Sequence, residues 1–248
     1  GSPAIGAIGA YKVLLGERWK PLENQFGIFP MIIGSIYVTA GAVLVGVPIG
    51  ILCAVFLARF CPPRLHRLLK PAVDLLAGIP SIVYGFFGLV VIVPLVQSLF
   101  GGSGKGILTA SVLLGIMILP TIISVTEASI RAVPESYYEG ALALGATKER
   151  SVFCAVMPGA RSGITAGVIL GTGRAIGETM AVVMVAGNAA VMPDGLLSGV
   201  RTLTANIVLE MGYAADLHRE ALIATAVVLF VFILIINLMF SLLKRKEG

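Results

Sequence analysis

The stretch NQFGIFPMIIGSIYVTAGAVLVGVPIGILCAVFLA, residues 24–58, contains 35 residues without a single Asp, Glu, Lys or Arg. About 20 consecutive apolar residues are enough to cross the hydrocarbon core of a bilayer as a helix. Three more stretches repeat the pattern, with 30 uncharged residues at 75–104, 21 at 106–126 and 23 at 221–243. The whole chain is 57% hydrophobic and 12% charged, whereas soluble domains carry about 25% charged residues. These figures exclude a soluble enzyme and indicate a membrane protein.

A fifth long apolar stretch differs from these four because it carries charge. Only Arg174 and Glu178 interrupt the 32 residues that separate Arg161 from Asp194. Ionisable side chains near the bilayer centre are costly, so they face a protein interior or a water-filled path and often mark transport pathways. The sequence therefore predicts an all-α membrane protein with five transmembrane helices and a functional site in the fourth.

The basic residues predict the orientation of these helices. The predicted spans lie at about 29–60, 74–100, 107–130, 162–190 and 221–243, with a segment 1–28 before them and a tail 244–248 after them. Eleven of the 18 Lys and Arg residues fall in the loops on one side, and six fall in the loops on the other. The positive-inside rule makes the first side cytoplasmic, with segment 131–161 and the C-terminus on it and segment 1–28 outside. The net charge of +5 reflects this bias, so we expect no nucleic-acid partner.

The cysteines and histidines indicate no metal site. Cys53, Cys61 and Cys154 lack CxxC spacing, and two of them lie in or near cytoplasmic loops where thiols stay reduced. His66 and His218 are isolated in sequence, and we expect both to be solvated loop residues.

The longest cytoplasmic segment carries helix signals of its own. Pro134 suits a helix start and Gly145 a helix end, which predicts a short helix over 135–144. A second helix is predicted to begin with Thr147 as its N-cap and to stop near Pro158. Either the helix pair connects two spans along the membrane surface, or it is a docking element for a cytoplasmic partner.

This segment also carries a motif. It reads Glu139-Gly140-Ala141, then Gly145 after three residues, then Ala155 after nine more, followed by Met157-Pro158. The spacing resembles the EAA motif of the permease subunits of bacterial ATP-binding-cassette importers. Gly140, Ala155 and Met157 depart from the commonest residues but keep their size or apolar character. The resemblance implies that Glu139, Gly140, Ala141, Gly145 and Pro158 couple the chain to an ATPase.

Four other stretches narrow the resemblance to the phosphate-specific permeases. They are Leu76–Gly85, which reads LAGIPSIVYG, Gly173–Ala181, which reads GRAIGETMA, Gly187-Asn188, and Arg201–Thr204, which reads RTLT. The last three favour the PstC-type subunit over its PstA-type partner. The likeness runs from about Trp19 to Lys246 and implies a type I, MetI-like permease fold with a cytoplasmic coupling helix. The family's first transmembrane helix is expected to be absent, which accounts for an outward-facing start.

The resemblance also implies a setting in the cytoplasmic (inner) membrane and a set of partners. They are a PstA-like second permease, two copies of an ATP-binding ATPase subunit, an extracytoplasmic phosphate-binding protein, inorganic phosphate and the lipid bilayer. The ATPase subunits are expected to bind ATP and Mg, so this chain is predicted to be neither an enzyme nor a cofactor-binding protein.

The two charges in the fourth span suit a phosphate path. In a continuous helix, Arg174 and Glu178 lie on one face, one turn apart. A guanidinium donates two parallel hydrogen bonds to phosphate oxygens and stays charged at cellular pH. We expect Arg174 to receive the anion and Glu178 to weaken its hold by competing for the same donors, and the resemblance adds Thr179 to this translocation site. The alternative is an internal ion pair that holds two spans together.

Glycines in the same span predict close helix packing. Gly163, Gly167 and Gly171 repeat every four residues and form one smooth stripe for a neighbouring helix. Gly173 and Gly177 flank Arg174 and serve either helix packing or the clearing of space for a ligand.

Two alternatives to a phosphate importer remain open at this point. The first keeps the architecture but changes the anion to sulfate or molybdate, because Arg174 alone does not separate oxyanions. The second is an ion-coupled secondary transporter with Glu178 as its proton site. Against it, such transporters are usually built from internal repeats, and the chain shows no self-similar halves.

Overall fold

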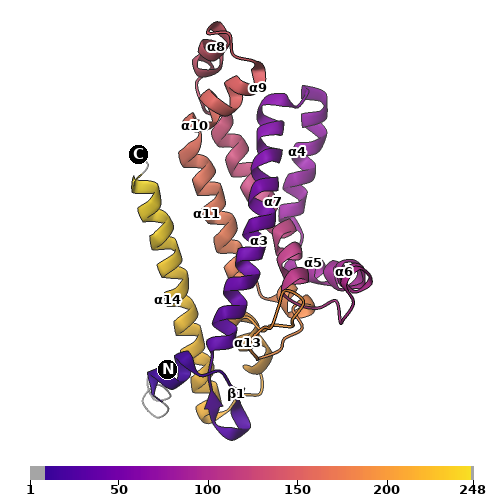
Figure 1. Cartoon of the computed structure of the whole chain (residues 1–248), viewed down its shortest axis with the longest axis vertical. Helices are drawn as coiled ribbons and strands as arrows, with labels where there is room; N and C mark the ends of the chain where they lie inside the picture. The colour runs from indigo at the N-terminus through magenta and orange to yellow at the C-terminus, as the bar shows by residue number, and fades with distance from the viewer. Residues whose placement is uncertain (1–8, 247–248) are drawn as a thin grey trace.

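The computed structural model describes residues 9–246, which are mostly helical (Figure 1). Residues 1–8 of the predicted segment 1–28 and residues 247–248 of the predicted tail lie outside the described residues. The helices are α2 (Ala10–Leu15), α3 (Phe29–Val55), α4 (Pro63–Gly78), α5 (Ser81–Phe87), α6 (Val93–Phe100), α7 (Ile107–Arg131), α8 (Glu135–Ala143), α9 (Lys148–Ser151), α10 (Met157–Gly159), α11 (Arg161–Gly177), α12 (Met180–Val185), α13 (Leu203–Glu210) and α14 (Asp216–Lys246).

Short irregular turns and one small sheet complete the structure. Three π-helical turns, η2 (Phe56–Phe60), η3 (Gly88–Ile92) and η4 (Val152–Val156), continue longer helices. Strands β1 (Trp19–Lys20) and β2 (Gln25–Phe26) pair antiparallel across the 3₁₀ turn η1 (Pro21–Glu23), with Trp19 opposite Phe26. We call residues 19–26 the N-terminal hairpin.

The apolar helices confirm the predicted all-α membrane fold. Within residues 9–246, four helical stretches are long and apolar enough to cross a membrane, namely Phe29–Phe60, Ser81–Phe100, Ile107–Arg131 and Asp216–Met239. A fifth span results if Lys148–Gly159 and Arg161–Gly177, which are bent by 74° at their junction, count as one. Helices α3, α7, α11 and α14 run along the long axis of the molecule (Figure 1). The end that carries α8 and α9 is called the α8 end below, and the opposite end the α13 end.

Helices α3 and α7 form the centre of the bundle because glycines let their backbones approach closely. A Cβ atom at Gly46 would lie 2.8 Å from the Gly115 carbonyl oxygen, and one at Gly50 would lie 2.8 Å from Ile122 Cγ2. The spacing of the two glycines therefore marks the packing seam, as small residues do between membrane helices. The main core cluster surrounds this seam and includes fully buried Leu113.

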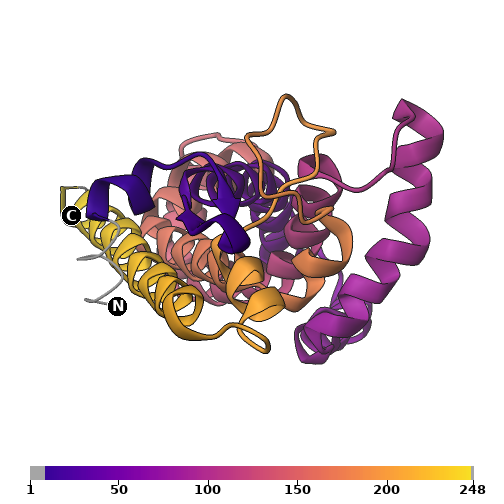
Figure 2. The same ribbon diagram turned by 90° about the horizontal axis from the view of Figure 1, so that it is seen from below.

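The second predicted span, 74–100, is wrong in its first part. Helix α4 ends at Gly78, Ile79 is extended with φ −70° and ψ 127°, and a new helix begins at Ser81. Pro80 causes the break because it lacks an N–H and drives the preceding residue out of the helical conformation. Figure 1 looks along α6, whereas Figure 2 shows α5 and α6 running across the bundle.

Helix α4 is held on α7 by charged groups. The Glu127 carboxylate, which is buried in α7, lies 2.6 Å from His66 Nε2, 2.9 Å from Arg131 Nε and 3.6 Å from Lys70 Nζ. A buried carboxylate is stabilised by pairing and hydrogen bonding. His66 and Arg131 both contact Oε1, whereas Oε2 has no hydrogen-bond partner among the described residues and lies 3.6 Å from the Lys70 ammonium. The expectation that His66 is a solvated loop residue is therefore wrong.

A second buried carboxylate organises the α13 end. Glu210 accepts hydrogen bonds from Trp19 Nε1 at 2.8 Å and Arg201 Nη1 at 2.6 Å, and His218 Nε2 lies 2.8 Å from it. These contacts join the N-terminal hairpin, the segment before α13 and the start of α14. His218 is thus a partner of Glu210 rather than a solvated loop residue.

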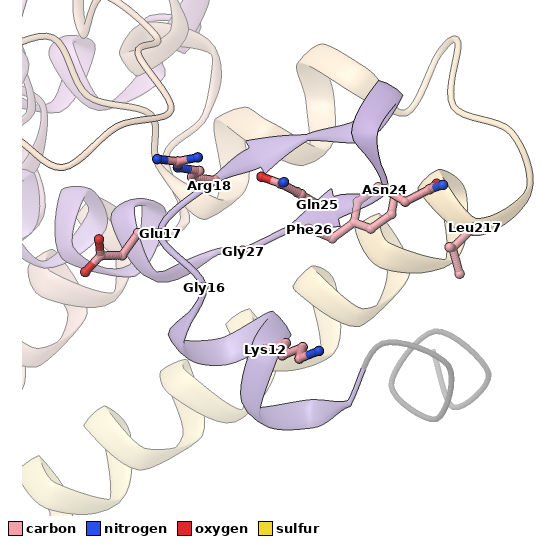
Figure 3. A pocket seen from close by; sticks show the side chains of 9 residues that line it. All are labelled: Lys12, Gly16, Glu17, Arg18, Asn24, Gln25, Phe26, Gly27 and Leu217. Atoms are coloured by element: carbon pink, nitrogen blue, oxygen red, sulfur yellow. The ribbon is translucent and has the colours of Figure 1, made fainter.

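A polar hollow of about 710 Å³ opens beside the N-terminal hairpin (Figure 3). Its charged lining residues carry both signs and are Lys12, Glu17 and Arg18. None of the residues predicted for translocation lines this hollow.

Candidate translocation site and coupling segment

Arg174 lies in the last turn of α11 and is half-buried. Its Nη1 donates a hydrogen bond of 3.4 Å to Thr121 Oγ1 of α7. A cation in the last turn of a helix is favoured by the negative end of the helix dipole. The bond to Thr121 joins α11 to α7 at a positive charge that lies within an apolar region of the sequence.

Glu178 does not continue the helix, which overturns the expected arrangement of the two charges. Helix α11 ends at Gly177, and Glu178 is extended with φ −70° and ψ 135°. Its Oε1 accepts hydrogen bonds from the backbone N–H groups of Thr179 at 3.0 Å and Ala181 at 3.3 Å. Within residues 9–246 no ion pair joins Arg174 to Glu178. The carboxylate is instead occupied by the free N–H groups at the start of α12.

Two threonines stabilise this break in the fourth span. Thr179 Oγ1 donates to the Gly177 carbonyl oxygen at 3.3 Å, and Thr204 Oγ1 donates to the Glu178 carbonyl oxygen at 3.0 Å. Backbone groups released by a break at membrane depth need such partners. In many transporters, the substrate site is formed by broken helices. The predicted span 162–190 is therefore corrected to α11, a break at 178–179, and α12.

The glycines of α11 divide into two groups. A Cβ atom at Gly163 would collide with Ser129, one at Gly167 would lie 3.0 Å from Thr126 Oγ1, and one at Gly171 would lie 2.8 Å from Ile122 Cγ1. All three contacts are with α7, which is the neighbour that the stripe accommodates. At Gly173 and Gly177 a Cβ atom would meet nothing within 4 Å. The packing role expected for these two is absent from the described chain, which leaves open space beside Arg174.

Alanine substitutions at Gly171 and at Gly173 test whether the two groups of glycines differ in their packing against α7. Gly171→Ala is expected to lower the free energy of unfolding in detergent by about 1–3 kcal/mol relative to Gly173→Ala, the typical cost of overpacking. The reason is that Ile122, fully buried in α7, has no room to retreat from the new methyl group. Thermal unfolding of the two purified variants compares them directly. Equal stabilities would show that α11 and α7 do not meet at Gly171.

Segment 131–161, called the coupling segment below after the role expected for it, folds as its sequence signals predict. Helix α8 follows Pro134 and has the acidic Glu135 in its first turn. It ends in two hydrogen bonds, from Gly145 N–H to the Leu142 carbonyl oxygen and from Ala146 N–H to the Ala141 carbonyl oxygen. This pattern requires a left-handed residue, and Gly145 supplies it with φ +84°. The Thr147 hydroxyl then caps α9 by accepting the Arg150 N–H.

The residues expected to couple to an ATPase lie on the surface of this segment. Glu139, Gly140, Gly145 and Pro158 are exposed, and Ala141 is half-buried. Helix α8 has no buried residue, and Leu144 at its end is 92% exposed. The helix therefore presents a free face at the α8 end (Figure 1). Arg174 lies near the far end of α11, about 20 Å from the start of that helix at 1.5 Å per residue.

Sequence reasoning missed three polar residues in or near the candidate translocation site. Thr121 and Thr204 bond to Arg174 and Glu178, and Tyr84 donates to the Leu76 carbonyl oxygen at 2.9 Å across the α4–α5 break. Tyr84 and Thr204 fall within stretches that carry the family resemblance, and all three are polar residues in apolar surroundings. Their polarity is the sequence feature that could have identified these three residues, but polarity does not reveal which groups they contact.

Residues 46–247 match the family described as binding-protein-dependent transport system inner membrane component. The chain belongs to this family. Among its relatives, the phosphate transport system permease protein PstC of Mesorhizobium japonicum is 39% identical over 94% of this chain and 77% of its own length. The probable ABC transporter permease protein YqgH of Bacillus subtilis is 36% identical over 98% of this chain and 81% of its own length.

Solved permease structures share the fold of this family member. A chain of the methionine ABC transporter MetNI in an inward-facing conformation matches with a TM-score of 0.70 and 20% identity, covering 93% of this permease and 100% of that chain. A chain of a bacterial alginate ABC transporter, in complex with an alginate-bound periplasmic protein, matches with a TM-score of 0.65 and 16% identity, covering 99% and 88%. The expectation of a MetI-like permease fold is confirmed.

Proposed function

We propose that this permease is the PstC-type subunit of an ATP-driven importer and that it moves inorganic phosphate across the cytoplasmic membrane. The observation that carries the proposal is the half-buried Arg174 at the broken end of α11, with open space at Gly173 and Gly177 beside it. The name of the Mesorhizobium relative supplies the anion. A planar guanidinium suits phosphate because it donates two parallel hydrogen bonds to phosphate oxygens.

The geometry of the break leaves the positive charge of Arg174 without a neutralising contact from Glu178. Because the Glu178 carboxylate is occupied by two backbone N–H groups, it does not neutralise the guanidinium directly. Among the described residues, the Arg174 side chain bonds to the neutral Thr121 hydroxyl at a long 3.4 Å, and an incoming anion displaces such a bond easily. A transport path needs a ligand site that also releases its ligand. A single guanidinium without a preformed cage meets that need.

Uptake against a gradient requires an energy source outside this chain. We assign that role to two ATPase subunits that bind ATP and Mg and dock on the exposed face of α8, with a PstA-like permease and an extracytoplasmic phosphate-binding protein completing the complex. This assignment places the α8 end and the C-terminus in the cytoplasm. The basic loops at that end support the orientation, since Lys and Arg collect on the cytoplasmic side.

The structure weakens the case for Glu178 as a proton carrier. A carboxylate that accepts two backbone N–H bonds at a helix start serves to hold the break between α11 and α12. A sulfate or molybdate permease would keep the same architecture, so the anion itself has to be measured.

The decisive experiment purifies the chain with its partners and reconstitutes the complex in liposomes with the binding protein outside. ATP-dependent uptake of radiolabelled phosphate, unaffected by excess sulfate or molybdate, is the expected result. Uptake that a sulfate or molybdate excess abolishes would reassign the anion. A chain that purifies without any ATPase and responds to a proton gradient would overturn the importer assignment and restore Glu178 as the candidate.

A further inference from the structure

One arginine links the exposed helix α8 to the main bundle. Arg59 lies in the π-helical turn η2, which continues α3 at the α8 end. Its Nη1 is 2.8 Å from Glu135 Oε2 in the first turn of α8, and its Nη2 donates to the Ile130 carbonyl oxygen of α7 at 3.4 Å. The guanidinium also lies over the ring of Tyr138, with its carbon 5.8 Å from the ring centroid. A single side chain therefore joins the turn that continues α3 to both α8 and α7.

Few other contacts hold α8 against the bundle. No residue of α8 is buried, and Tyr138 is its half-buried anchor against the apolar cluster around Val55 and Val156. The Arg59 side chain is only 12% exposed, so its bond to Glu135 is screened less than a surface ion pair. A displacement of α8 therefore acts on Arg59 as well as on the apolar cluster that Tyr138 contacts.

Arg59 lies in a π-helical turn, which sets the direction of its side chain. The turn at Phe56–Phe60 is wider than an α-helical turn, and Cys61 N–H closes it on the Phe56 carbonyl oxygen at 2.8 Å. Single π-helical turns inside α-helices are rare and often occur at functional sites. Within the described residues, Arg59 Nε is buried without a hydrogen-bond partner. An unsatisfied buried donor lowers stability, so stability alone does not explain the placement of this side chain.

We propose that Arg59 is the positioning residue that transmits movement of α8 into α3 and α7 during each ATP cycle, through its contacts with Glu135, Tyr138 and the Ile130 carbonyl. The inference rests on the proposed function, in which an ATPase moves α8. Helices α3 and α7 pack through the glycine seam, so a shift at their α8 ends reaches α11 as a rigid movement.

The test measures phosphate transported per ATP hydrolysed by the reconstituted complex. Arg59→Ala and Glu135→Gln are each expected to lower this ratio about tenfold, the effect of one lost charge-assisted hydrogen bond, while ATP hydrolysis changes less than about twofold. Glu135 is half exposed, at 58%, so its neutral replacement leaves the fold undisturbed. The charge swap Arg59→Glu with Glu135→Arg is expected to recover part of the ratio. Arg64→Ala, at an exposed arginine of the neighbouring α4, is the matched control and is expected to keep the ratio.

Each other outcome overturns the inference in a recognisable way. An unchanged ratio in both single variants means that Arg59 transmits nothing. Parallel loss of transport and hydrolysis, with less ATPase bound to the permease, means that Arg59 only holds the docking surface together. Absence of ATP-driven phosphate uptake in the unmodified complex means that the proposed function has failed, and the inference with it.

Discussion

Replacing Arg174 with alanine is expected to lower ATP-driven phosphate uptake about 100-fold, while the chain still assembles with its partners. Each hydrogen bond to a charged group contributes about 1.5–3 kcal/mol, and the guanidinium offers two of them to the anion. Its bond within the chain is a single long contact to Thr121, so its loss costs the fold little. The measurement is uptake of radiolabelled phosphate by proteoliposomes, with subunit stoichiometry checked on the same preparation.

Two companion variants separate the shape of the guanidinium from its charge. Arg174→Lys keeps the positive charge but loses the planar fork, so we expect an intermediate rate. Arg219→Ala removes an equal charge from an exposed position on α14, and we expect near-normal uptake. Unchanged uptake in Arg174→Ala, with the complex intact, would contradict the role assigned to this residue.

Replacing Gly145 with valine is expected to reduce phosphate-stimulated ATP hydrolysis at least about tenfold without touching the translocation site. Gly145 has φ +84°, which lets its own N–H and that of Ala146 close α8 with one hydrogen bond each. The left-handed backbone conformation costs an L-residue roughly 1–2 kcal/mol, and a β-branched residue more. The turn after α8 must therefore rearrange. Because a Cβ atom at Gly145 would meet nothing within 4 Å, the effect arises from the backbone and not from a collision within the chain.

The control for this variant is Gly145→Asn, since asparagine tolerates the left-handed conformation better than other side chains. Coupling is expected to survive largely in Gly145→Asn and to fail in Gly145→Val. Equal loss in both variants would show instead that the ATPase needs the space beside Gly145. Normal stimulated hydrolysis in both would remove this turn from the coupling mechanism.

Much of the fold could be predicted because membrane insertion depends on composition over long stretches. Charge-free runs predicted the apolar helices α3, α7 and α14, and capping signals at Pro134, Gly145 and Thr147 predicted the helices of the coupling segment. The glycine spacing in α11 identified the face that packs on α7. Each of these predictions rests on local chemistry, which a sequence displays directly.

The errors occur where a break and its partners are far apart in the chain. The break after α11 is stable because Glu178 bonds to the start of α12 and because Thr204, 26 residues away, donates to its carbonyl. Pro80 signalled the break after α4, yet the direction that α5 takes afterwards depends on its packing against α12. His66 and His218 were misjudged because their partners, Glu127 and Glu210, belong to other helices.

The sequence by itself determined that this protein is a helical membrane permease with a coupling segment, because apolar length, helix capping and motif spacing are properties of neighbouring residues. Tertiary structure alone decided that Arg174 stands apart from Glu178, that buried carboxylates join separate helices, and that Arg59 reaches α8. These features depend on hydrogen bonds between residues distant in the chain. The cost of burying a charge is met only when such partners arrive together in the folded state.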